Sequence, residues 1–125
     1  MNMILLFSHE LTKEQIDDAQ IYLRVNNFIY LPKKLQIIWS NIPPYIDCLN
    51  DHLKPVKVFL EQNSRQNDYI LVQGDFGATY SMINYSKSLG LIPIYSTNKR
   101  IVEEILDNNN IKKLSFFKHI IFRKY

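Results

Sequence analysis

Four short apolar runs along the chain predict β-strands. The first, residues 3–7, is apolar without interruption, which is typical of a strand buried on both faces. Residues 28–31, 68–73 and 91–96 are similar runs, each bounded by Pro, Gly or polar residues. The last run contains Pro93, which lacks a backbone donor. We therefore expect this strand either at an edge of the sheet or paired only after Pro93.

Two segments between these runs have the spacing and the boundary residues of helices. Thr12, followed by Gln15 three residues later, is a capping-box pattern and predicts an amphipathic helix over residues 12–24. A second helix is predicted over about residues 78–88, with Gly90 as its stop signal.

Three other segments have less regular patterns. Residues 32–62 predict two or three helical pieces, because the pattern is broken at Pro43-Pro44 and interrupted at Pro55. Residues 101–106 predict one or two helical turns. Residues 114–125 predict one or two further strands.

Strands that alternate with helices need crossover connections, which favour a parallel sheet covered on both faces. The sequence therefore predicts an α/β fold, a small three-layer Rossmann-like domain with a mostly parallel central sheet. The chain has 125 residues, of which 46% are hydrophobic, and this is enough for the core of one ordinary domain. Because no repeat or linker divides it, we expect residues 1–125 to form a single domain.

The composition excludes several classes of protein. A single cysteine, Cys48, excludes an internal disulfide framework, and no Cys and His spacing is typical of a zinc site. We expect Cys48 to be a buried thiol. The longest uncharged stretch, residues 35–46, contains polar side chains and two prolines, so no membrane span is predicted. The N-terminus lacks the pattern of a signal peptide, and we expect a cytoplasmic protein.

Basic residues are concentrated in the last fifth of the chain. Residues 1–98 contain 8 Lys and Arg against 9 Asp and Glu, whereas residues 99–125 contain 7 against 3. Such an excess favours an anionic partner, although a small basic excess is also an ordinary surface.

Three predicted loops are the candidates for a ligand site, because ligands of open α/β sheets bind at the carboxyl ends of the strands. The middle loop has two glycines within four residues and opens a helix, which favours close approach of a phosphate or nucleotide. Its candidate ligand-binding residues are Gln73, Gly74, Asp75, Phe76, Gly77, Ala78 and Thr79. The loop is neither a dinucleotide fingerprint nor a P-loop. The alternative is a tight structural turn in which Asp75 is only the helix N-cap.

The other two loops carry the candidate catalytic groups. Ser8 and His9 follow the first strand, where a hydroxyl can bind phosphate or sugar and an imidazole can move a proton. Thr97, Lys99 and Arg100 follow the fourth strand, where a cation would neutralise a phosphate. In the alternative interpretation both segments are solvated turns.

Other chemically notable residues favour structural roles. His119 lies in an apolar strand pattern and predicts a buried histidine with satisfied hydrogen bonds, and His52 has no evident partner. Trp39 favours the core. The segment around residues 39–44 could instead be a lid over a ligand.

Five stretches of the sequence resemble one family over nearly the whole chain. They are MILLFSHELT, FIYLPKKLQIIWSNIPP, YILVQGDFGATYSMINY, LGLIPIYSTNKR and FKHIIFRKY, of which QGDFGATY is the most specific. They resemble a small CRISPR-associated family, numbered twenty in the Csx series, whose members are accessory proteins of type III CRISPR systems.

The resemblance implies a CARF-like domain (a CRISPR-associated Rossmann fold) that binds cyclic oligoadenylates, most often cyclic tetra-adenylate. It implies a cytoplasmic homodimer that acts as a ring nuclease without metal or cofactor and switches off antiviral signalling. In that chemistry a ribose 2′-hydroxyl attacks the adjacent phosphate and leaves a 2′,3′-cyclic phosphate end. Ser8 or His9 would lie at the 2′-hydroxyl as the polar group or general base, and the Gly74 loop with Lys99 or Arg100 would bind the phosphate.

Two other functions remain open at this stage. A binding protein could sequester the same messenger without cutting it. A non-catalytic interaction module would use the glycine loop only as a turn. In none of these cases do we expect binding of a long nucleic acid or of a membrane.

Overall fold

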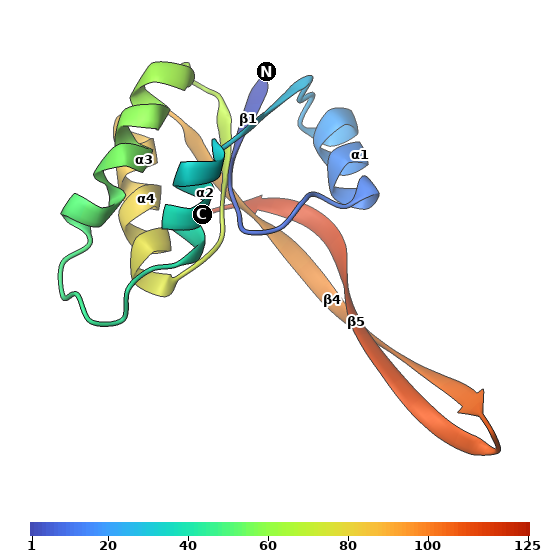
Figure 1. The fold of residues 1–125 in the computed structure, drawn as a ribbon. Helices are drawn as coiled ribbons and strands as arrows, with labels where there is room; N and C mark the ends of the chain where they lie inside the picture. Colours follow the sequence, from blue (N-terminus) through green and yellow to red (C-terminus); the bar gives the residue numbers. More distant parts are fainter.

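One mixed β-sheet forms the centre of the protein. The structure is a computed structural model that describes residues 1–125, and its sheet has the strand order β2-β1-β3-β4-β5 (Figure 1). The first four strands run parallel, and β5 pairs antiparallel with β4. The strands are β1 (Asn2–Leu6), β2 (Asn27–Tyr30), β3 (Tyr69–Val72), β4 (Ile92–Asp107) and β5 (Asn110–Lys124). This confirms the predicted α/β class and is compatible with a Rossmann-like fold.

Helices cover both faces of the sheet, as the alternating pattern predicted. Helix α1 (Lys13–Tyr22) lies on one face. Helices α2 (Lys33–Ser40), α3 (Asn50–Asn63) and α4 (Phe76–Ser88) lie on the other (Figure 1). None of these helices is long and apolar enough to cross a membrane.

Side-chain caps fix the helix starts that matter for the ligand site. Thr12 Oγ1 accepts a hydrogen bond from Gln15 N at 3.2 Å, and Gln15 Oε1 accepts from Thr12 N at 2.9 Å. This confirms the capping box at the start of α1. At the start of α4, Asp75 Oδ2 accepts from Ala78 N at 3.0 Å, so Asp75 is the N-cap.

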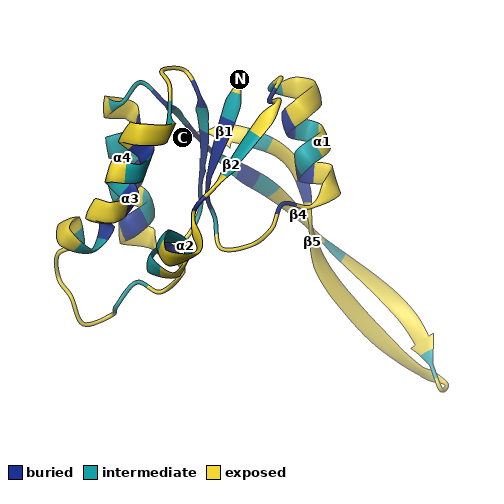
Figure 2. Ribbon diagram, turned by 45° about the horizontal axis from the view of Figure 1, so that its top comes forward, coloured by how far each residue is buried: buried dark blue, intermediate teal, exposed yellow.

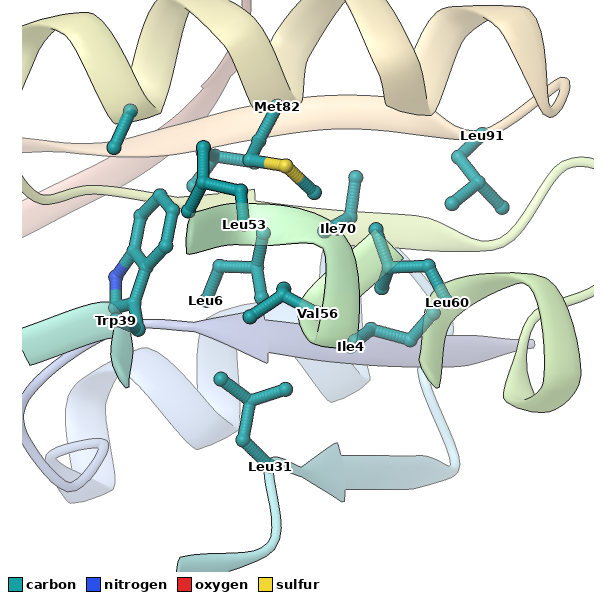
Figure 3. Close-up of a cluster of buried hydrophobic side chains, with 12 residues drawn as sticks. Ile4, Leu6, Leu31, Trp39, Leu53, Val56, Leu60, Ile70, Met82 and Leu91 are labelled. Atoms are coloured by element: carbon teal, nitrogen blue, oxygen red, sulfur yellow. The ribbon is translucent and has the colours of Figure 1, made fainter. Parts of the chain in front are cut away.

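The continuous apolar run of β1 is explained by two hydrophobic cores. Met3 and Leu5 point towards α1, whereas Ile4 and Leu6 point into the larger core under α2, α3 and α4 (Figure 3). Since successive side chains of a strand alternate between faces, a strand covered on both faces needs apolar residues throughout. Figure 2 shows the resulting burial of β1 in the middle of the domain.

The segment predicted as two or three helical pieces forms two helices. Pro43-Pro44 lies in the connection between α2 and α3, as predicted, but Pro55 does not interrupt α3. The helix continues because Leu53, Val56 and Leu60 are fully buried in the larger core, and this burial offsets the lost backbone hydrogen bond.

The prediction of helical turns over residues 101–106 is wrong. These residues belong to β4, which pairs with β5 in a long hairpin that extends away from the domain (Figure 1). The hairpin turns at Asn108 and Asn109, whose φ angles of 50° and 66° are left-handed. Asparagine tolerates this conformation in two-residue hairpin turns. We call residues 98–119, the projecting part of this hairpin, the arm.

Two smaller expectations also need correction. Strand β4 is not at the sheet edge, because it lies between β3 and β5. Its pairing with β5 starts at Ile94, and the Pro93 carbonyl accepts from Tyr125 N at 3.1 Å. The missing donor of Pro93 therefore faces β5 and costs no hydrogen bond to β3. Cys48, expected to be buried, is exposed in the connection between α2 and α3.

Candidate functional site

A polar cavity lies where the strand order reverses. Strand β1 has β2 on one side and β3 on the other, and the connections from the carboxyl ends of β1 and β3 cover opposite faces of the sheet. A cavity of about 520 Å³, which we call the switch-point pocket, opens there. It is lined by Phe7, Ser8, His9, Glu10, Thr12, Gln15, Gln73, Gly74, Ser96, Asn98 and Phe117.

Four of the residues predicted from sequence line this pocket. Ser8 and His9 follow β1 and are exposed, with Ser40 Oγ donating to Ser8 Oγ at 3.1 Å. Gln73 and Gly74 follow β3. Because parallel strands end at one edge of the sheet, these two loops meet although 65 residues of sequence separate Ser8 from Gln73.

Gln73 and Gly74 are held in place by neighbouring elements. The Gln73 side-chain oxygen accepts from Ser96 N at 2.9 Å, and its backbone carbonyl accepts from Trp39 Nε1 at 3.2 Å. A Cβ atom on Gly74 would lie 3.0 Å from the Trp39 indole ring. Trp39 is therefore part of the pocket's supporting wall as well as of the core, which is where the sequence predicted it.

The rest of the glycine loop does not line the switch-point pocket. Asp75 caps α4, as in the alternative interpretation, Gly77 faces Leu49, and Ala78 is buried in the core. Phe76 and Thr79 line a separate hollow of about 340 Å³. Its other lining residues are Gln73, Gly74 and Tyr125.

The predicted cations lie on the arm rather than in a loop. Lys99 and Arg100 are exposed residues of β4, and neither lines the pocket. Arg100 Nε donates to Ser115 Oγ on β5 at 2.8 Å. Thr97 Oγ1 is bonded to the backbone of Ile121, donating to its carbonyl at 3.0 Å. The expected loop is absent because β4 continues through these residues as a strand.

Seven lining residues were not named as ligand groups from the sequence. Glu10, Ser96 and Asn98 fell within the predicted ligand loops without a role of their own. Thr12 and Gln15 were predicted only as a capping box, Phe7 only as part of a strand, and Phe117 only as part of the C-terminal strand pattern. Phe117 could not have been placed, because it enters the pocket from β5 and pairs with Arg100 across the hairpin. The only usable signal was position, since Ser96 stands at the carboxyl end of the apolar run of β4.

A chain of three polar side chains, two of them buried and the third mostly buried, borders the pocket. Ser96 Oγ lies 2.5 Å from His119 Nδ1, and His119 Nε2 lies 2.7 Å from Asp18 Oδ2 on α1. Ser96 and His119 are only 5% and 8% exposed. His119 is thus a buried histidine with both ring nitrogens bonded, as predicted. His52, which had no evident partner in the sequence, bonds through Nε2 to the Ile38 carbonyl at 3.1 Å.

A second hollow adjoins the switch-point pocket along the base of the arm. Its volume is about 540 Å³, and it shares Thr12, Gln15, Asn98 and Phe117 with the first. His119 and Lys118 lie on its wall. The polar surface therefore continues from the strand ends onto the arm. No three His, Cys, Asp or Glu side chains lie close enough to hold a metal ion together.

Two tyrosines outside the pocket have perturbed ionisation. Burial, together with the hydrogen bond and the negative charge of Glu61, raises the pKa of Tyr85 to about 12. Burial, with a smaller contribution from Tyr95, raises the pKa of Tyr125. The Tyr125 hydroxyl donates to the Val72 carbonyl at the end of β3. Both groups are therefore neutral hydrogen-bond donors at neutral pH.

The comparisons with known proteins found one matching family model and one similar protein. The sequence model of a family described as "Uncharacterized protein MJ1673 family" matches residues 1–123. A protein of Methanocaldococcus jannaschii described as "Uncharacterized protein MJ1673" is 56% identical over 123 residues, which cover 98% of this chain and 95% of the relative. No solved structure matches.

Proposed function

We propose a function for this chain, which belongs to the MJ1673 family. It binds a cyclic oligoadenylate, with cyclic tetra-adenylate as the expected substrate, in the switch-point pocket and cleaves it to linear products with 2′,3′-cyclic phosphate ends. The protein is then a CARF-like, cytoplasmic ring nuclease that ends type III CRISPR signalling and works as a homodimer. This assignment rests on the resemblance of the sequence and on the position of the pocket.

The observation that carries the proposal is the convergence of Ser8, His9, Gln73 and Gly74 at the strand-order reversal. This is where open α/β sheets bind nucleotides. The lining is largely polar but carries only one acid, Glu10, so a phosphodiester would meet little repulsion. Phe117 is 72% exposed and offers an aromatic face on which an adenine can stack.

The chain's own residues supply positioning and proton transfer in this proposal. Ser8 and His9 lie in the exposed bend that follows β1, and they line the same cavity as Gly74. Gly74 presents backbone with no side chain in the way, and the attacking hydroxyl belongs to the substrate. Alignment of that hydroxyl with its phosphate is then the main task of the protein.

The direct test is to incubate purified protein with radiolabelled cyclic tetra-adenylate in EDTA under multiple-turnover conditions. The expected result is conversion to linear products that end in a 2′,3′-cyclic phosphate. A Ser8→Ala, His9→Ala double variant is expected to lose conversion by a factor of about 10² or more. Recovery of intact messenger, neither bound nor cleaved, would contradict the proposal.

One observation favours the alternative of a binding protein that sequesters the messenger. Lys99 and Arg100, the cations expected to stabilise the phosphate, do not line the pocket of their own chain. A site without these cations has fewer groups for the charge that develops in the transition state. Tight binding of cyclic tetra-adenylate without any turnover in the same assay would establish this alternative.

A further inference from the structure

We infer that Ser96, His119 and Asp18 form a proton relay that opens into the switch-point pocket. The inference deepens the proposed function, on which its cleavage test rests. The three residues come from β4, β5 and α1, and the hairpin and the capped helix bring them together. Of the three, Ser96 alone lines the switch-point pocket; His119 and Asp18 lie behind it.

The hydrogen bonds define where the protons lie. The Asp18 carboxylate can only accept, so the Nε2 atom of His119, 2.7 Å away, carries a hydrogen. In the neutral imidazole the Nδ1 atom is then an acceptor, and it faces Ser96 Oγ at 2.5 Å. The Ser96 hydroxyl therefore donates to His119, one lone pair of its oxygen accepts from Gln15 Nε2 at 3.4 Å, and the other remains available to a group in the pocket.

The arrangement has the roles of a serine, a base and an orienting carboxylate. The Asp18 side chain is 13% exposed and that of His119 is 4% exposed, so their interaction is shielded from water. A positive charge formed on His119 would lie directly against Asp18. Gln15 Nε2, 3.4 Å from Ser96 Oγ, is a further polar group beside the serine.

In the proposed step, the ribose 2′-hydroxyl gives its proton to Ser96 Oγ while Ser96 gives its own proton to His119 Nδ1. The 2′-oxygen forms a bond to the adjacent phosphorus, and the bond from phosphorus to the 5′-oxygen breaks. The leaving 5′-oxygen takes a proton from solvent, and His119 later returns one to solvent. Ser96 is the residue that takes the 2′-hydroxyl proton in this step, His119 and Asp18 act through it, and Ser8 and His9, which line the same pocket, position the ribose and the phosphate.

The first test measures Ser96 reactivity without the messenger. An alkyl fluorophosphonate is attacked by an activated serine, which expels fluoride while the serine proton passes to the histidine. We expect the probe to label Ser96, as located by peptide mass spectrometry, and the label to be lost in His119→Gln. Absence of label at Ser96, or equal labelling in His119→Gln, would overturn the relay whether or not the protein cleaves cyclic tetra-adenylate.

The second test compares cleavage by variants that keep the fold. Ser96→Ala is expected to lower the single-turnover rate by a factor of about 10² or more, with the dissociation constant for cyclic tetra-adenylate within about threefold. Asp18→Asn keeps an acceptor for His119 but removes the charge, so a purely structural tie would leave its rate unchanged. We expect its rate to fall about tenfold while its melting temperature stays close to wild type.

Unaltered cleavage by Ser96→Ala would overturn the relay and leave the proposed function standing. Labelling of Ser96 by the fluorophosphonate in a protein that does not cleave cyclic tetra-adenylate would support the relay and overturn the proposed function. Ser96→Thr, which retains a hydroxyl, is the matched control and is expected to keep most of the wild-type labelling.

A second inference rests on the arm and is independent of the ligand. We infer that the free edge of β4 pairs with the same edge of a second copy of this chain. The arm is a two-stranded ribbon, and isolated ribbons of this kind are marginally stable in water. Most residues of the arm are exposed (Figure 2), and they include apolar residues at both odd and even positions, whose side chains therefore point to both faces of the ribbon. They include Val102, Ile105, Leu106, Ile111, Leu114, Phe116 and Phe117.

The charge pattern of β4 identifies the occupant of that edge. Strand β3 pairs only with residues 92–94 of β4, so the β4 edge is unpaired along the arm. Along it, two cations (residues 99 and 100) are followed by two apolar residues and then by two acids (residues 103 and 104). An antiparallel copy centred on Ile101 places Lys99 of each chain directly opposite Glu103 of the other, and centring on Val102 does the same for Arg100 and Glu104.

The opposite edge of the hairpin has the reverse property. Strand β5 carries five Lys and Arg residues and no acid, so pairing with its own copy would place like charges together. Charge thus favours self-association through β4 and opposes it through β5.

Sedimentation equilibrium of charge-exchanged variants tests this interface. We expect wild type to have twice the chain mass of 14.9 kDa. Lys99→Glu with Arg100→Glu, and separately Glu103→Lys with Glu104→Lys, should each yield monomers because their edges repel. Mixing the two variants should restore a dimer, which misfolded monomers could not do. A monomeric wild type, or variants that remain dimeric alone, would overturn the inference.

Discussion

Gly74 satisfies two spatial demands at once. It stands at the carboxyl end of β3, where its backbone lines the switch-point pocket, and its α-carbon approaches the Trp39 indole. Any side chain would have to displace a fully buried tryptophan that also donates to the Gln73 carbonyl. The packing reason for a glycine here is therefore independent of any ligand.

Gly74→Val is expected to lower the free energy of unfolding by about 1–3 kcal/mol, because it overpacks the space beside Trp39. Gly77→Ala is the control, since its added Cβ would meet only the terminal methyl group of Leu49 at 3.3 Å and Asp75 Oδ2 at 3.6 Å. Urea unfolding followed by tryptophan fluorescence measures both. Equal effects of the two substitutions would show that Trp39 does not constrain position 74.

Tyr85 predicts a specific pH dependence of stability. Its pKa is raised to about 12 in the folded protein and is about 10 when unfolded, so the folded state holds the proton more tightly. The resulting stabilisation is fully present below pH 10 and is lost as the pH rises towards 12. Tyr85→Phe should therefore reduce the loss of stability between pH 9 and about pH 11 in urea titrations. An unchanged slope would contradict the assignment.

Helix α4 begins at an N-cap formed by the Asp75 carboxylate. Asp75 accepts from Ala78 N, and the helix then packs Ala78 and Met82 into the larger core. The turn that orients Gly74 towards the pocket is thus joined directly to the helix start. The capping residue Asp75 directly follows Gly74 in the chain, so a shift of the helix start would also move this part of the pocket wall.

Asp75→Ala is expected to cost about 1 kcal/mol of stability, because the Ala78 backbone donor loses its partner. Asp75→Asn keeps an acceptor oxygen and is expected to remain within a few tenths of a kcal/mol of wild type. Thermal unfolding monitored by circular dichroism distinguishes them. If both variants were equally destabilised, the charge of Asp75 rather than its capping oxygen would be the stabilising feature.

The arm shows where local sequence patterns were insufficient. Apolar residues 101, 102, 105 and 106 fit a helical repeat, but β-branched side chains also suit a strand, and the turn at Asn108-Asn109 decided the outcome. The spacing of apolar residues within one segment carries no information about a partner strand that begins only after the turn. The same limit hid Phe117 from the predicted site.

At the scale of the whole molecule, position in the sheet was the reliable guide to the site. The apolar run of β1 and the loop after β3 predicted that Ser8, His9, Gln73 and Gly74 would meet, and they do. The same rule predicted that Lys99 and Arg100 would line the site, and this prediction is wrong. Strand β4 does not end near the pocket but continues into the arm. Residues that follow an apolar run line the pocket only where the strand ends at that point.

Amide chemical shifts measured during titration with cyclic tetra-adenylate test most directly whether the switch-point pocket is the binding site. The chain has three glycines, so their amide signals are few and readily assigned. Gly74 lines the pocket, whereas Gly90 precedes β4 at the opposite edge of the sheet. We predict saturable shifts for Gly74, Ser8 and Asn98 with Gly90 unmoved. Saturable binding that leaves Gly74 unmoved, or no binding, would contradict the account.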